Sequence, residues 1–186
     1  MNVGEEICGE WLRHIKGCDF VQYNVKTLDV QGEIDVVGIN LDQRVVYGCE
    51  VAIHLVTGLN YVRGSQPDNV DRLTTKLRKD HAYLRKAFPD YRQILMLWSP
   101  VVRDQRKGSK HNQMADVRAI VDALAKKPGV VVEPVINERF QEVLDELRRH
   151  AGRETKEMTS TVMRFLQVEE HLRKHLGKLE RVGEAR

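Results

Sequence analysis

The sequence predicts an α/β fold in which helices flank a mixed β-sheet, followed by a C-terminal helical extension. Three observations support this prediction. Apolar residues recur at helical spacing near the N-terminus. Three strand-like segments, separated by a glycine and a tight turn, come next. After them, helical segments alternate with two strongly apolar segments of strand length.

The first half of the chain predicts one helix and three strands. The helix spans residues 3–16, because Ile7, Trp11, Leu12 and Ile15 share one face, and Gly17 ends it. The three strands fall within residues 20–30, 32–41 and 44–56, with a turn over residues 40–43. Strands joined so closely are expected to form an antiparallel meander.

The second half predicts helices alternating with strands. A helix is expected over residues 70–87, capped by Asp68 or Asn69 and ended near Pro89. Residues 93–102 read QILMLWSPVV, so this strand should be central and covered on both faces. A helix over 114–127 and one more buried strand over 130–136 follow. We therefore expect a core domain over residues 1–137.

Residues 138–186 should be helical, with a break at Gly152. The last helix carries an apolar stripe at helical spacing: Met158, Val162, Phe165, Leu172, Leu176 and Leu179. Such a stripe must be buried, either on the chain's own domain or against another chain. It is therefore a candidate packing, dimer or partner interface.

Composition bounds the class of protein. No apolar run approaches the roughly 20 residues that cross a bilayer, and the N-terminus lacks a signal-peptide layout, so we expect a cytoplasmic protein with no membrane association. The three cysteines form no zinc-type spacing and are expected to be reduced and packed. A P-loop and RNA-binding signatures are absent from the sequence.

Charge is distributed unevenly along the chain. Residues 1–60 contain four Lys/Arg and nine Asp/Glu, whereas residues 61–110 contain twelve and five. An acidic first third beside a basic middle suits a cation site next to a surface that attracts polyanions.

The predicted hairpin carries two acids that can lie side by side. Asp35 belongs to its first strand and Glu50 to its second. Two carboxylates among Val and Ile are costly unless a cation neutralises them, and Mg²⁺ is a natural candidate, with the backbone carbonyl of Val51 as a further ligand. The alternative is that both acids face solvent, as charged residues on strands usually do.

The pattern Gly-Glu-Ile-Asp, a hairpin, then Glu-Val-x resembles the PD-(D/E)XK nucleases, whose fold is restriction-endonuclease-like. It looks most like the YraN-like, Holliday-junction resolvase and Mrr-like groups. The opening Gly4-Glu5, Trp11-Leu12 and Gly17 is similar to the first helix of those proteins. The resemblance covers the chain to about residue 136.

The resemblance implies a metal-dependent DNA endonuclease that uses Mg²⁺, with Mn²⁺ as a substitute. Asp35 and Glu50 would be metal ligands, and Glu5 would complete the site, with Glu10 or Glu6 as fallback choices. Cutting both strands would need two sites, so a homodimer or a larger complex is expected. DNA repair, recombination and antiviral defence are compatible contexts.

One position departs from the family pattern. The catalytic lysine of the family usually stands two residues after the second acid, and here that residue is Ala52. The alanine could have been engineered in place of a lysine, or catalysis could have been lost. Alternatively, another group could have taken the role: His54 on the same strand face, or Lys76 or Lys79 on the next helix.

A basic segment after the apolar strand is the expected DNA-binding surface. Residues 103–113 include Arg103, Arg106, Lys107, Lys110 and His111, and such cations bind phosphates without reading sequence. Lys76 could add to this surface. Ala52 also leaves open a non-catalytic nuclease-fold subunit that binds DNA or a partner protein.

Overall fold

The computed structural model describes residues 2–27, 32–105, 111–127 and 129–184. Five strands form the main sheet, in the spatial order β1-β2-β3-β6-β7. Their bounds are β1 Phe20–Lys26, β2 Glu33–Asn40, β3 Val45–Val51, β6 Arg92–Ser99 and β7 Val131–Ile136. β1, β2 and β3 are antiparallel, whereas β3, β6 and β7 run parallel. The predicted meander and mixed sheet are therefore confirmed.

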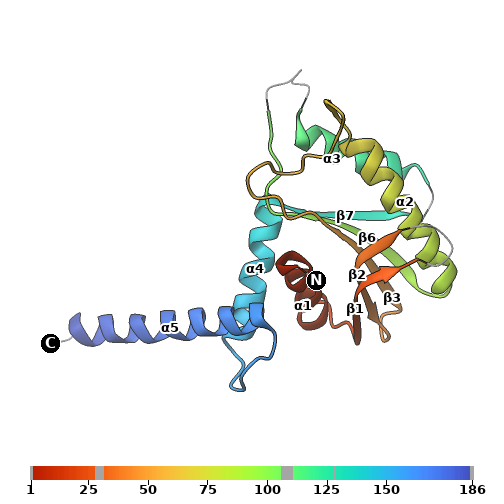
Figure 1. Ribbon diagram of the computed structural model, residues 1–186. Helices are drawn as coiled ribbons and strands as arrows, with labels where there is room; N and C mark the ends of the chain where they lie inside the picture. The colour runs from red at the N-terminus through yellow and green to blue at the C-terminus, as the bar shows by residue number, and fades with distance from the viewer. Residues whose placement is uncertain (1, 28–31, 106–110, 128, 185–186) are drawn as a thin grey trace.

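Helices cover both faces of this sheet (Figure 1). α1 (Val3–His14) packs on β1, β2 and β3, and α4 (Asn137–Ala151) packs beside it. α2 (Asn69–Ala87) and α3 (Gln113–Ala125) lie on the opposite face. The parallel pairing of β3 with β6 and of β6 with β7 requires these crossover helices. A short hairpin, β4 (Val62–Arg63) with β5 (Gln66–Pro67), precedes α2.

Local sequence explains how α1 begins and how closely it approaches the sheet. Asn2 caps α1 and forms a capping box with Glu5. Gly38 on β2 lets the helix approach, because a Cβ there would lie 2.9 Å from a side-chain carbon of Leu12. On the opposite face, a Cβ at Gly48 would lie 2.6 Å from Leu84 of α2. The two glycines thus set how closely α1 and α2 approach the same sheet.

The central strand is as predicted and the last strand is not. β6 is buried from Ile94 to Ser99, between β3 and β7. β7 is an edge strand with only Val135 buried, so the expectation of a second fully buried strand is wrong. The physical reason is its position: β7 pairs on one side only, and Val131 is exposed at 41%.

The two halves of the C-terminal region behave differently. Phe140, Val143 and Leu147 of α4 belong to the same apolar core as Trp11 and Trp98. The predicted break at Gly152 is confirmed, and α5 (Thr161–Glu184) follows it. α5 leaves the domain and extends away from it as a single arm (Figure 1). Met158 precedes α5, so the predicted stripe begins one turn too early.

None of the described helices combines the length and apolar character that a membrane span needs. Cys8, Cys18 and Cys49 are all buried and free, as expected for packed thiols.

Candidate functional site

The hairpin of β2 and β3 brings Asp35 and Glu50 together. Val36 pairs with Cys49, so the preceding position of the ladder sets Asp35 opposite Glu50. The Asp35 carboxylate accepts a hydrogen bond from the backbone N–H of Val51, at 2.7 Å. Both acids belong to the sheet face that α2 covers, since Lys76 of that helix contacts each of them. The predicted pair of carboxylates is therefore present.

Lys76 of α2 joins the two acids. Its ammonium lies 3.1 Å from a carboxylate oxygen of Asp35 and also forms an ion pair with Glu50. The side chain of Glu50 is 5% exposed, that of Asp35 14% and that of Lys76 31%. One ammonium therefore bridges two largely buried carboxyl groups, and the side chain that carries it is partly exposed.

The electrostatics of this triad are strongly perturbed. Burial, and then the charge of Asp35, raise the pKa of Glu50 to about 8, although Lys76 opposes the shift. Burial alone would lower the pKa of Lys76, but the attraction of Glu50 and Asp35 outweighs it and raises that pKa. The site thus keeps a fixed positive charge beside a carboxyl group that is costly to ionise.

A third acid, Asp80, lies one turn further along α2. It is buried, and its Oδ2 has no hydrogen-bond partner within the described part of the chain. Burial, and then the charge of Asp35, raise its pKa to about 7, against the effect of Lys76. Lys76 and Asp80 line a cavity of about 320 Å³ together with Glu33 and Thr27. The cavity thus reaches the side of the cluster formed by Lys76 and Asp80.

The sequence did not single out Asp80, although it contained a signal. Leu73, Leu77 and Leu84 form the buried face of α2. Lys76 and Asp80 fall among them at helical spacing, where charged residues are uncommon. Two charges within an apolar helix face indicate a site that lies against the sheet.

His54, which follows Glu50 in the chain, does not lie where the sequence predicted. β3 ends at Val51, so His54 is beyond the strand and the expectation that it projects from the strand beside Glu50 is wrong. The pairing with β6 ends where the backbone N–H of Ala52 donates to the carbonyl of Trp98, and residues 55–57 then form a turn. The ring of His54 contacts Tyr61 edge-on, with 5.8 Å between ring centroids. Ala52 is 2% exposed and packs in an apolar cluster with Leu59.

The acids of α1 have other partners. Glu5 closes the capping box of its own helix by accepting from the backbone and side chain of Asn2. Glu6 accepts hydrogen bonds from Ser160 and from the backbone of Val162. Glu10 pairs with Arg13 and His14. α1 lies on the sheet face opposite α2.

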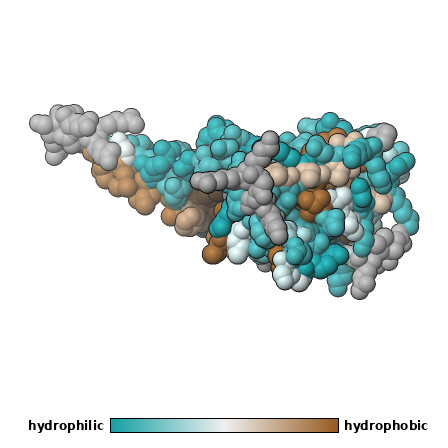
Figure 2. Space-filling model, turned by 90° about the horizontal axis from the view of Figure 1, so that it is seen from above, coloured by the Kyte–Doolittle hydropathy of each residue, from teal (hydrophilic) through white to brown (hydrophobic). Residues whose placement is uncertain are grey.

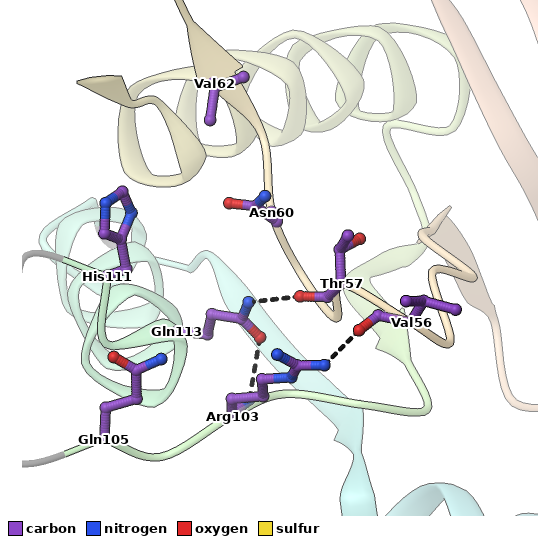
Figure 3. Close-up of a pocket in the computed structure, with 8 residues that line it drawn as sticks. All are labelled: Val56, Thr57, Asn60, Val62, Arg103, Gln105, His111 and Gln113. Carbon is purple, nitrogen blue, oxygen red and sulfur yellow. Dashed lines mark hydrogen bonds between the residues drawn. The ribbon is translucent and has the colours of Figure 1, made fainter. Parts of the chain in front are cut away.

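The described residues at the two ends of the basic segment lie beside the loop that follows Glu50. Because β3 and β6 are parallel, the loops that leave their carboxyl ends meet at one edge of the sheet. There, the N–H of Leu59 donates to the carbonyl of Val101. Figure 3 shows the Arg103 guanidinium directed at the carbonyl of Val56, to which it donates a hydrogen bond. Arg106, Lys107 and Lys110 lie outside the described residues.

A cavity of about 380 Å³ lies at this edge (Figure 3). Arg103 and His111 line it, and its polar wall includes Thr57, Asn60 and Gln113. The side-chain amide of Gln113 ties the two loops together, since it donates to the carbonyl of Thr57 and accepts from the N–H of Arg103. Hydrogen bonds thus tie the two loops together at this edge.

Asp35 and Glu50 are the described candidates to hold the divalent cation that the sequence implies. Among the described residues, no group of three or more His, Cys, Asp or Glu side chains is arranged to hold a metal ion. Asp35 and Glu50 alone still match Mg²⁺, which takes one or two carboxylates and keeps several waters. Burial, and then the charge of Asp35, raise the pKa of Glu50, so a nearby positive charge favours its ionised form. The two carboxylates thus have the ligand chemistry of one such ion, and in this structure the ammonium of Lys76 contacts both of them.

Comparisons of the chain with protein-family models, with curated proteins and with solved structures find no match.

Proposed function

We propose that this protein is a metal-dependent DNA endonuclease of the PD-(D/E)XK type, with a restriction-endonuclease-like core. The observation that carries the proposal is the contact of Lys76 with both Asp35 and Glu50. An ammonium group stands beside the two acids although the usual lysine position holds Ala52. Of the three explanations for that alanine, the geometry favours a lysine relocated to α2.

Asp35 and Glu50 would hold the divalent cation, with the carbonyl of Val51 as a third oxygen. A bound Mg²⁺ lowers the pKa of water and stabilises negative charge on a phosphate. Asp35 is held in place by the N–H of Val51, and β2 and β3 fix both carboxylates on paired strands. The acids are therefore preorganised by the sheet rather than by a loop.

Lys76 would act on the phosphodiester. Its raised pKa keeps the ammonium protonated at neutral pH, so it serves as a hydrogen-bond donor and a fixed positive charge. Such a group can orient the attacking water and balance the charge that develops on the phosphate. Lys76 is 31% exposed and lines the cavity, so it would be accessible to a phosphate bound there.

DNA would approach at the edge where the loops after β3 and β6 meet. Glu50 lies one residue before the end of β3, and Arg103 follows β6 by four residues. Arg63 and Arg72 line the cavity that leads to Lys76, so cations flank the acids on the side of α2 as well. Phosphate contacts of this type supply affinity that falls as salt concentration rises.

A second function is supported by the same contact. Lys76 already pairs with both acids, so the triad is also consistent with a non-catalytic nuclease-fold subunit that binds DNA or a partner protein. In that case Asp35, Glu50 and Lys76 would stabilise the fold as a buried ion cluster. Turnover separates the two functions, whereas DNA binding does not.

The test is cleavage of duplex, branched and single-stranded DNA with Mg²⁺ or Mn²⁺, comparing the protein with Asp35→Asn. The proposal expects metal-dependent cleavage that the substitution abolishes, together with weaker Mn²⁺ binding by calorimetry. Asp42→Asn, in the turn between β2 and β3, is the control for loss of a nearby acid. Cleavage that survives Asp35→Asn would overturn the proposed site. DNA binding without any cleavage would favour the second function.

A further inference from the structure

The exposed face of α5 carries five apolar side chains. Phe165, Val168, Leu172, Leu176 and Leu179 are between 48% and 69% exposed. At 100° per residue they fall within an arc of about 80°, so they form one stripe. Figure 2 shows brown, apolar side chains gathered along the projecting arm. We call these five residues the α5 stripe.

The α5 stripe faces away from the rest of the molecule. Met163 is fully buried in the core and Leu166 packs against it. Gln167 donates hydrogen bonds to the carbonyls of Glu154 and Lys156, and Lys174 donates to that of Gly152. These residues lie on the opposite side of α5 from the stripe. The domain therefore uses one face of the helix and leaves the other face uncovered.

The spacing of the α5 stripe residues is the same when it is read towards either end of the helix. Counting from Leu172, the other members lie four and seven residues away on each side. The resulting 3-4-4-3 spacing follows an eleven-residue repeat, which keeps the contact line nearly straight along a helix. Two antiparallel copies related by a twofold axis at Leu172 would oppose Phe165 to Leu179 and Val168 to Leu176. Every apolar residue would then meet an apolar partner.

The charges of α5 also favour the antiparallel arrangement. Within α5, the exposed Glu169 precedes Leu172, whereas the exposed Arg173 and Lys178 follow it. Parallel helices would set the basic segments side by side. Antiparallel helices would instead set Arg173 of each copy near the exposed Glu169 of the other, and they also oppose the two helix dipoles. The stripe thus fits a second copy of itself in reverse direction.

We propose that α5 pairs with α5 of a second copy of this chain in an antiparallel arrangement, with the α5 stripe as the contact surface. The two core domains then lie at opposite ends of the helix pair. The pairing does not depend on nuclease activity, so either proposal can fail alone. The contact is short, about 21 Å from Phe165 to Leu179, so the dimer should dissociate on dilution.

The first test is the mass of the full chain by sedimentation over about a hundredfold range of concentration. The dimer should form at the upper end, and Leu172→Asp should abolish it. His171→Asp adds the same charge one residue away, outside the stripe, and should leave the dimer intact. Both residues are exposed, so neither substitution removes a core contact. A wild-type chain that stays monomeric, or equal behaviour of the two variants, would overturn the proposal.

The second test establishes direction by disulfide cross-linking. Phe165→Cys and Leu179→Cys chains, mixed and oxidised, should cross-link to each other. Neither variant should cross-link when oxidised alone. The native cysteines are buried and do not interfere. Efficient cross-linking of Phe165→Cys alone would show a parallel pair and contradict the antiparallel arrangement.

Discussion

The ammonium of Lys76 lies 3.1 Å from Asp35, 41 residues earlier in the chain. This contact joins α2 to β2 across the sheet face and brings a cation to the hairpin that carries both acids. The same ammonium pairs with Glu50 on β3. Three elements thus converge on one charged cluster, and its cation comes from a helix rather than from the strand position held by Ala52.

Asp80→Asn should change how stability depends on pH. The folded chain holds the Asp80 proton up to about pH 7, whereas the ordinary pKa of the group is 3.8. Between these values the folded state binds more protons, so this group lowers the free energy of unfolding as pH rises. Asn removes that decline. The free energy of unfolding of the variant minus that of wild type should therefore be about 1–3 kcal/mol higher at pH 8 than at pH 4.

Urea denaturation at the two pH values measures this difference. Asp90→Asn, an exposed acid beyond the end of the same helix, is the control. If the free energies of unfolding of Asp80→Asn and wild type differ by the same amount at both pH values, the pKa of Asp80 is not raised by folding.

Ala52→Lys should destabilise the protein without increasing cleavage. Ala52 is 2% exposed in an apolar cluster, so a longer side chain overpacks the site and brings a second ammonium close to Lys76. Overpacking of this kind costs about 1–3 kcal/mol. Chemical denaturation should show the loss, and Leu55→Lys, at a position 67% exposed, should show none of that size. Stronger cleavage by Ala52→Lys would instead indicate that position 52 is where the site needs its lysine.

His54→Ala should leave cleavage within about twofold of wild type. His54 lies beyond the end of β3 and contacts Tyr61 rather than the acids. Cleavage rates under saturating Mg²⁺ check this, with Asp35→Asn as the inactive reference. A loss of two orders of magnitude on His54→Ala would place the histidine in the catalytic machinery.

Much of the fold could be predicted from local pattern. The meander, the central β6 and the break at Gly152 follow from apolar periodicity, glycine and turn residues, which act over a few positions. The burial of β7 could not be predicted, because its VVVEPVI sequence suits a central strand equally well. Which strand becomes an edge is decided by pairing over the whole sheet.

The site was predictable only in part. Asp35 and Glu50 are joined by a short hairpin, so their proximity follows from strand geometry. The end of β3 at Val51, which moves His54 away, depends on the last bond to β6 and left no local signal. The choice of Lys76 rather than Lys79 depends on how α2 is rotated against the sheet. That rotation is set by long-range packing of Leu73, Leu77 and Leu84.

The most direct test of the relocated lysine is the Mg²⁺-dependent cleavage rate of Lys76→Ala beside Lys79→Ala. Both substitutions remove one positive charge from α2, but the ion pairs with Asp35 and Glu50 belong to Lys76. Folding of each variant is checked by its denaturation midpoint, because Lys76→Ala also leaves two acids without their cation. The account predicts that Lys76→Ala loses about 10²–10³-fold in rate while Lys79→Ala stays near wild type. A folded Lys76→Ala that cleaves as fast as wild type would contradict it.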